Sequence, residues 1–333
     1  MKKLVHLGFG VLALVLFVPQ VSAQNTPEFC ANDGAAKVAL YQKFLANYKS
    51  TGEEQKQADG FAIEYINRYG SCPDEGDVKV TRFIRKWLGL YAKVVREFDC
   101  RSFAYQQQWA KAFEVCQVVA NENPESTDWP LLLTLAGYAN VTSGSRDKSL
   151  NAEAAKMARR AVELIEAGKA LPSWHPFASR DEALGFLHYS QGVFLFESAP
   201  ADAAAAFFKA AQSNSSFQRE ATTYGYLASL YEINELQQLV AEYRKNFAPP
   251  EAIPPKSRYD ATAARINKTL DRVIDAYARA LSIMNANPQA DKKLKASVTE
   301  RLTSYYQYRH QDSEAGLMEL IAGVLQTPLP VKE

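Results

Sequence analysis

The chain has 333 residues, of which 47% are hydrophobic and 23% are charged, so it can fold around at least one sizeable core. This composition excludes an intrinsically disordered chain, and the scarcity of alternating Val, Ile and Thr argues against a β-sheet. The formal net charge is +1, and a surface this close to neutral lacks the basic field that nucleic acid binding requires.

The N-terminus has the pattern of a secretory signal peptide. Two lysines precede an apolar run over 4–18, and residues 21–23 are a small-residue cleavage site. We expect residues 1–23 to be removed by cleavage after Ala23, so that the mature protein is periplasmic or secreted. It then carries 36 Lys+Arg against 37 Asp+Glu, and no later stretch is apolar enough to span a membrane.

Residues 24–76 predict an N-terminal capping hairpin of two helices. Apolar residues recur at helical spacing from Ala35 to Tyr48 and again up to Tyr69, where Gly70 and Pro73 end the pattern. A repeat protein made of stacked helices needs an atypical unit of this kind at its end.

The central region, 77–248, begins with a long helical pattern and then repeats one set of offsets. In two places a small residue is followed 12, 16 and 19 positions later by small or apolar residues. The two sets are Cys100, Ala112, Cys116 and Val119, and Gly192, Ala204, Phe208 and Ala211. We interpret these positions, with Gly137, as those where neighbouring helices pack closely.

The stretch 185–216 shows this organisation most clearly. A helix that carries Gly192 ends at a break before Pro200, and Pro200 suits the first turn of a second helix. Because such a hairpin cannot bury both of its apolar faces alone, it requires neighbours of the same kind.

This stretch resembles the tetratricopeptide repeat, a two-helix unit with small and aromatic residues at fixed offsets. Motif matches cover hairpins near 93–124, 185–216 and 265–288, the last of which includes Ala276 and Ala280. The resemblance implies an all-α fold, an α-solenoid of about 12 to 14 helices arranged as antiparallel hairpins, that serves as a protein- or peptide-binding scaffold.

Four cysteines follow the signal peptide, and an even number in an exported chain suggests two disulfides. Cys30 precedes the first predicted helix and Cys72 follows the second, so an antiparallel hairpin brings them together. The resemblance implies the other pair, because Cys100 and Cys116 occupy positions that face each other in this repeat family. Four buried free thiols are the alternative.

The chain is expected to close with a Pro-rich linker over 249–257 and C-terminal helices over 258–333 that serve as a second cap. A long helix is predicted to end near Met284, followed by two shorter ones. The tail from Pro328 to Glu333 is expected to be loose.

No nucleotide-binding, zinc-protease, hydrolase or calcium-binding motif occurs in the chain after residue 23, and the sequence indicates no cofactor, metal or catalytic residue. His175 and His188 have no clustered partner, so each is expected to be structural or simply exposed. An enzyme that uses carboxylates alone, such as a carbohydrate-active enzyme on a helical fold, is the alternative, because paired carboxylates leave no local motif.

The expected function is therefore that of a non-enzymatic scaffold of the cell envelope that binds a protein or peptide partner. In the repeat register set by Gly192, four apolar residues would line the inner groove: Phe186, Tyr189, Val193 and Phe196. The same four residues could instead form core, or the chain could be a purely structural envelope protein. The sequence does not indicate an oligomeric state.

Overall fold

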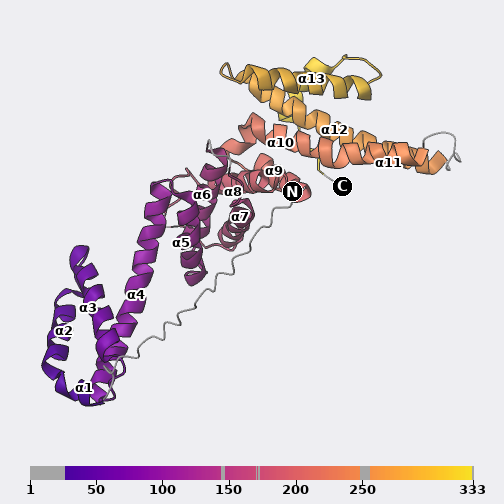
Figure 1. The fold of residues 1–333 in the computed structure, drawn as a ribbon. Helices are drawn as coiled ribbons and strands as arrows, with labels where there is room; N and C mark the ends of the chain where they lie inside the picture. Colours follow the sequence, from indigo (N-terminus) through magenta and orange to yellow (C-terminus); the bar gives the residue numbers. More distant parts are fainter. Residues whose placement is uncertain (1–26, 144–146, 170, 172, 248–255, 332–333) are drawn as a thin grey trace, which may run out of the picture. The chain divides into compact units, whose positions relative to one another are not determined.

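A computed structural model describes residues 27–143, 147–169, 171, 173–247 and 256–331, and every regular element in these segments is helical (Figure 1). The all-α prediction is confirmed over this part of the chain. The predicted signal peptide, with its cleavage site after Ala23, lies outside the described residues. None of the described helices combines the length and apolar character needed to cross a bilayer.

The chain divides into two compact units between Val95 and Arg96, within the long helix α4 (Glu75–Tyr105). The first unit contains α1 (Pro27–Asn32), α2 (Gly34–Asn47), α3 (Glu53–Tyr69) and the first part of α4. α2 and α3 pack as the antiparallel pair that the sequence predicts.

Aromatic side chains fill the core of this first unit. The ring of Phe44 is fully buried and meets the ring of Trp87 edge-on, with centroids 5.1 Å apart. Asp33 precedes α2 but makes no capping bond with its side chain, which accepts hydrogen bonds from Arg68 and Tyr69 of α3 instead.

The second unit begins with helices that pack on one another in chain order. They are α5 (Trp109–Glu122), α6 (Asp128–Thr142), α7 (Asn151–Glu166), α8 (Arg180–Leu195), α9 (Pro200–Gln212) and α10 (Ala221–Tyr231). This neighbour-on-neighbour packing is that of stacked hairpins in an α-solenoid.

The disulfides are Cys30–Cys72 in the first unit and Cys100–Cys116 in the second, which are the two expected pairs. Cys100 and Cys116 are buried together with Ala112 and Val119, so all four packing residues predicted at this hairpin lie in the core. Two disulfides are typical of a protein that resides in an oxidising compartment outside the cytoplasm.

Helices α8 and α9 form the predicted hairpin, with Pro200 in the first turn of α9, but the contact register differs by one residue. A Cβ at Gly192 would meet the ring of Phe207 at 2.7 Å, so the face opposite Gly192 is centred on Phe207 and not on Phe208. Ala203, Phe207 and Ala210 are fully buried, whereas Ala204 and Phe208 are only partly buried; Ala211 is buried as predicted.

The composition of α9 explains this error. Its alanine-rich sequence contains two adjacent phenylalanines, so stripes one residue apart satisfy the same helical spacing. Only the contact with α8 selects between them. Gly137 of α6 is a second close approach, because a Cβ there would lie 2.6 Å from the Cβ of Ala154 on α7.

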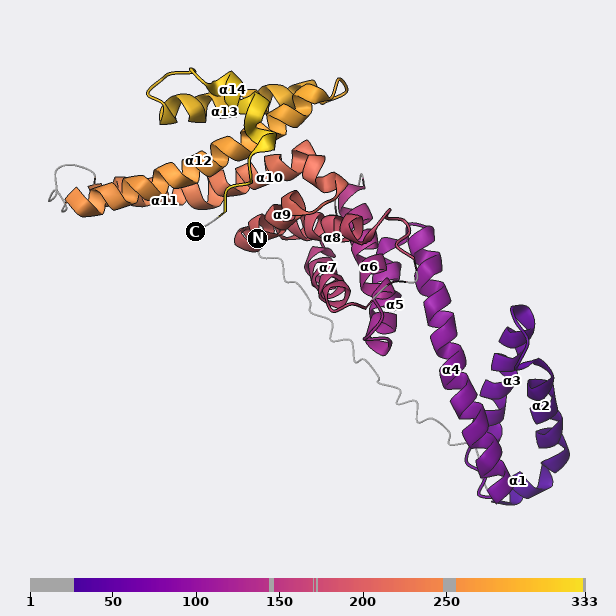
Figure 2. The same cartoon turned by 180° about the vertical axis from the view of Figure 1, so that it is seen from behind.

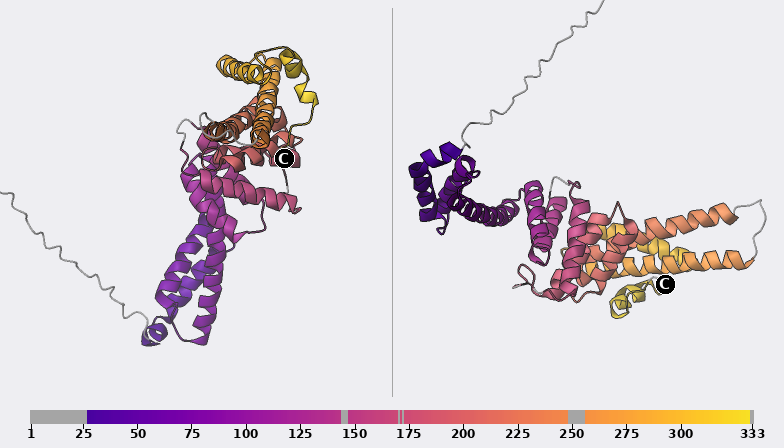
Figure 3. Two further views of the ribbon diagram at one scale, coloured as in Figure 1. Left: turned by 90° about the vertical axis from the view of Figure 1, so that its right-hand side faces the viewer. Right: turned by 90° about the horizontal axis from the view of Figure 1, so that it is seen from below.

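The C-terminal part of the second unit departs further from the expected repeats. After α10 come the π-helical turn η3 (Glu232–Leu236), α11 (Gln237–Phe247), α12 (Lys256–Ala286), α13 (Lys292–Arg309), α14 (Leu317–Gly323) and the short η4 (Val324–Gln326). In Figure 3 the two rods of α11 and α12 run side by side, and contacts between them agree.

The hairpin predicted over 265–288 is wrong, because α12 runs unbroken through this range to Ala286. No glycine or proline interrupts the chain between Lys256 and Ala286, so nothing in the sequence turns it. Ala276 and Ala280 are nevertheless fully buried. The predicted linker lies outside the described residues except for 256–257, which begin α12.

Replacing Gly192 with Ala is expected to destabilise the protein. The added Cβ would press on the fully buried ring of Phe207, which has no free space to move into. We expect the free energy of unfolding in urea to fall by about 1 to 3 kcal/mol. Gly225→Ala on α10 is the matched control: a Cβ there meets nothing within 4 Å, so stability should be unchanged or higher. Equal stability of the two variants would contradict the observed contact.

His188 is buried in α8, and its Nδ1 has no hydrogen-bond partner. Burial, with a smaller contribution from Lys209, lowers the pKa of His188 to about 4. The other charged residues lining the adjacent cavity are Glu166 and Asp181. Because the folded pKa lies below the unfolded one of about 6.5, only the unfolded chain takes up this proton as the pH falls below 6.5.

Stability is therefore expected to fall between pH 6.5 and pH 4, by about 3 kcal/mol for this group, and to be fully present above pH 6.5. His188→Gln should remove this part of the pH dependence in urea denaturation, whereas His175→Gln, at an exposed position, should leave it in place. Identical pH profiles for the wild type and His188→Gln would show that His188 is not a buried neutral group.

Candidate functional site

The four residues that the sequence assigns to a partner-binding groove lie in or against the core. Phe186 and Tyr189 are 5% and 7% exposed, and both rings pack on Phe217. Val193 and Phe196 are partly buried against the same core. Phe186 and Tyr189 thus lie in the core, which is the alternative that the sequence left open, because α9 and the 3₁₀ turn η2 (Ser216–Arg219) pack against α8 and cover them.

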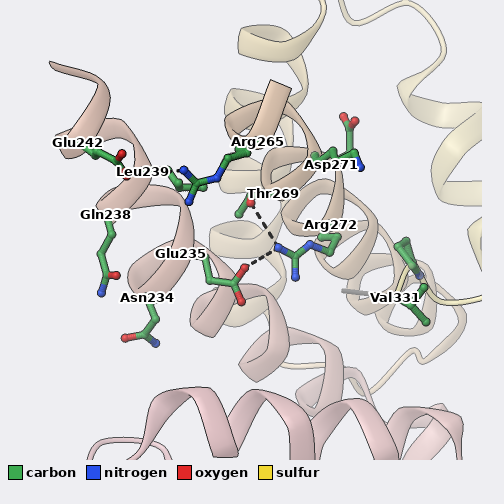
Figure 4. A pocket seen from close by; sticks show the side chains of 12 residues that line it. Asn234, Glu235, Gln238, Leu239, Glu242, Arg265, Thr269, Asp271, Arg272 and Val331 are labelled. Atoms are coloured by element: carbon green, nitrogen blue, oxygen red, sulfur yellow. Dashed lines mark hydrogen bonds and ion pairs between the residues drawn. The ribbon is translucent and has the colours of Figure 1, made fainter. Parts of the chain in front are cut away.

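A cavity of about 690 Å³ in the C-terminal part of the second unit is the better candidate for a binding site. Its walls are η3 and α11 on one side and α12 on the other, as Figure 4 shows, and the end of the chain contributes Pro330 and Val331. Most of its side chains are polar or charged: Asn234, Glu235, Gln238, Glu242, Arg265, Lys268, Thr269, Asp271 and Arg272. We call this cavity the charged cleft.

The acids of the charged cleft are each engaged by an arginine. Glu235 accepts a hydrogen bond of 2.5 Å from Arg272, and the Arg309 guanidinium lies 2.8 Å from a carboxylate oxygen of Asp271. Glu242 forms a longer ion pair with Arg265, at 3.9 Å between mostly exposed side chains. Carboxylates held in this way serve as hydrogen-bond acceptors for the arginines beside them.

Arg272 is the most enclosed cation of the cleft, with a side chain only 11% exposed. Its Nη2 donates to Glu235 and to the hydroxyl of Thr269, and its guanidinium lies 4.6 Å from the centre of the Tyr231 ring. The ring lends the cation further stabilisation. Arg272 thus links α10, η3 and α12, and it fixes one wall of the cleft.

A buried carboxylate holds the π-helical turn in place. Glu232 is 6% exposed and accepts hydrogen bonds from the hydroxyl of Tyr277 at 2.7 Å and from the guanidinium of Arg301 at 2.7 and 2.8 Å. Burial and the bond to Glu232 raise the pKa of Tyr277 to about 12. Burial and the same carboxylate also raise the pKa of Tyr305.

These contacts hold η3 against α12 and α13, next to the charged cleft. A π-helical turn inserts an extra residue into a helix and is frequent at functional sites, since it changes which face the following residues present. Here the turn ends where α11 begins, so it sets the direction in which Gln238 and Glu242 face α12.

Within the described segments, no group of three or more His, Cys, Asp or Glu is arranged to hold a metal ion. No model of a known protein family matches the chain, and no curated protein sequence matches it either. What the charged cleft can bind is therefore inferred from its own side chains.

Sequence reasoning did not find the cleft because its residues form no motif. They come from two helices on either side of the predicted linker, and alternating charges on a helix surface are usual for a solvated face. One signal was present: the sequence Tyr231-Glu232 places a carboxylate directly after an apolar helix stripe, where a charge must be either exposed or paired.

Glu232→Gln is expected to lower the free energy of unfolding by about 1 to 3 kcal/mol, because the amide cannot accept all the bonds that the carboxylate receives. Glu114→Gln on α5 is the control, at an exposed position where the change should stay within about 0.5 kcal/mol. Chemical denaturation of both variants measures the difference. If both lose the same small amount, Glu232 does not hold the turn.

Proposed function

We propose that the chain is a non-enzymatic, protein- or peptide-binding scaffold of the cell envelope, built from tetratricopeptide-like hairpins, and that the charged cleft is its binding surface. The observation that carries this proposal is the lining of the cleft: the acids Glu235 and Glu242 on the η3–α11 side lie across a cavity of about 690 Å³ from the cations of α12. Such a surface offers both donors and acceptors to the backbone and side chains of an extended segment.

The state of the carboxylates favours recognition over catalysis. A glycosidase needs one carboxyl group with a raised pKa opposite a second carboxylate, with room for a sugar ring between them. In the cleft, Glu235, Glu242 and Asp271 each form an ion pair with an arginine, so their side chains are engaged by cations and not by one another. Asp275 on the same helix has a pKa raised by burial, but it is bonded to Arg279.

The proposed location is the periplasm or the extracellular space, reached through cleavage of the signal peptide after Ala23. Two disulfides support it, because they form and persist in oxidising compartments. The partner would accordingly be an envelope or secreted protein.

A photo-crosslinking amino acid at Gln238, an exposed position in the cleft, tests this proposal in cells that express the protein. We expect irradiation to produce a covalent adduct with one defined partner, which mass spectrometry can identify. The control carries the crosslinker at Gln57, an exposed glutamine of α3 in the first unit, and should give no such adduct. Adducts at both positions, or at neither, would contradict the proposed surface.

The identified partner then allows a quantitative test with purified proteins. Arg265→Glu reverses a mostly exposed charge of the cleft and should weaken binding about tenfold, since it puts a repulsive charge where the partner docks. Lys148→Glu reverses a comparably exposed charge outside the cleft and should leave the affinity unchanged. Equal affinities of the two variants would place the partner elsewhere.

A further inference from the structure

The tail that the sequence predicts to be loose is held against the fold over its described residues, 328–331, and residues 332–333 lie outside the described part. After η4 the backbone is extended at Thr327, and the segment 327–331 passes over α12, as Figure 2 shows below the label of α14. Residues up to Leu329 lie beside the turn of α12 that carries Arg279, and Pro330 and Val331 lie beside the turn that carries Arg272. We call residues 327–331 the tail segment.

One buried arginine holds the tail segment by its backbone. Arg279 is 4% exposed and forms a two-point contact with Asp275, from Nε at 2.7 Å and from Nη2 at 3.2 Å. The carbonyl oxygens of Thr327 and Pro328, at 2.9 and 3.1 Å, and the Thr327 hydroxyl, at 3.2 Å, also lie within hydrogen-bond distance of Nη2, which shares its two hydrogens among these acceptors. Two consecutive backbone carbonyls thus converge on one charged donor.

The tail segment covers this donor from outside. Thr327 and Pro328 are exposed to solvent, whereas the guanidinium beneath them is almost completely buried. Backbone carbonyls are present in every peptide, so another extended segment could offer Arg279 the same acceptors. Asp275 takes only part of the donor capacity of the guanidinium, so loss of the tail segment would leave buried N–H groups of Arg279 without their carbonyl acceptors unless another segment supplied them.

An apolar contact follows the two carbonyls. Leu329 is partly buried against the core, and it borders a cavity of about 540 Å³ whose walls include Tyr224 of α10 and Ile283 of α12. Pro328 and Pro330 flank Leu329. Proline has no backbone N–H and favours extended backbone, so these two positions leave no donor unpaired and lose little conformational freedom when the segment lies in a groove.

We propose that this surface of α12 is a peptide-binding groove, that the tail segment fills it as an internal competitor, and that its ligand is an extended, proline-containing segment of a partner protein. The ligand presents two consecutive carbonyls to Arg279 and an apolar side chain to the Leu329 site. This inference rests on the proposed function for the class of ligand, and it adds the chemistry of recognition and an autoinhibitory contact.

The groove joins the charged cleft, because Pro330 and Val331 of the tail segment line the cleft. A partner segment that displaces the tail would therefore extend from Arg279 into the region of Arg272 and Arg265. The apolar and carbonyl contacts would fix the position of the partner segment, and the charged side chains of the cleft would contact the residues that follow.

The test uses the full chain and a fluorescein-labelled synthetic peptide with the sequence of residues 326–331. Leu329→Asp in the protein should release the tail segment, because it puts a charge into the apolar contact. Fluorescence anisotropy should then show binding of the peptide to Leu329→Asp at least about tenfold tighter than to the wild type, where the tethered tail competes at a high effective concentration. Thermal unfolding followed by circular dichroism verifies that the variant is folded.

Two controls keep the result specific to the groove. The same peptide with Asp in place of its leucine should fail to compete with the labelled peptide. Arg279→Lys, added to Leu329→Asp, keeps the positive charge but lacks the planar fork, and it should reduce peptide affinity severalfold. No binding of the peptide to folded Leu329→Asp, or equal affinity for both proteins, overturns the inference.

Failure here is distinguishable from failure of the proposed function. If crosslinking from Gln238 identifies a partner but the peptide does not bind, the chain is a scaffold whose tail is purely structural. If the peptide binds but crosslinking gives no partner, the groove exists and the charged cleft is not the docking surface.

Discussion

The fold of the second unit depends on how closely its helices can approach one another. Where α8 meets α9, the absence of a side chain at Gly192 leaves room for the buried ring of Phe207, and Gly137 lets α6 lie against Ala154 of α7. Each of these helices buries one face on its predecessor and another on its successor, so a single contact that is too wide would displace all later helices. The Cys100–Cys116 disulfide covalently joins the end of α4 to α5 at the start of this unit.

In the C-terminal part, which contains a π-helical turn and a 31-residue helix, buried charges fix how the helices pack. Glu232 and Arg279 both lie in the interior. Glu232 accepts hydrogen bonds from Tyr277 and Arg301 on two other helices, whereas Arg279 pairs with Asp275 on its own helix and donates to the backbone of the tail segment. Such groups are costly to bury and specify one arrangement, since no other packing supplies the same partners. The charged cleft and the groove that holds the tail segment both lie along α12, and Glu232 and Arg279 fix the position of this helix.

The sequence predicts what local patterns determine. Helical periodicity and Pro200 at a helix start were sufficient for the all-α class and the α8–α9 hairpin. The positions of Cys30 and Cys72 at the ends of a helix pair indicated the first disulfide, and the resemblance to the tetratricopeptide repeat implied the second. The stripe on α9 was assigned one residue too late, because adjacent alanines and phenylalanines satisfy two registers equally and only tertiary contact selects one. The tail from Pro328 was predicted to be loose, because the residue that holds it, Arg279, lies 49 positions away and shows no sign of it in the sequence. Phe186 and Tyr189 look the same in a groove and in a core, and burial alone separates the two cases.

The central claim is that α8 and α9 nest through Gly192 against Phe207, and nuclear magnetic resonance tests it directly. In a deuterated protein with protonated Gly and Phe, the Hα protons of Gly192 should show strong nuclear Overhauser effects to the ring of Phe207, and the ring should shift their resonances away from ordinary helical values. Contacts from Gly192 to the ring of Phe208 instead, or to no aromatic ring, would contradict this packing and the stacked arrangement built on it.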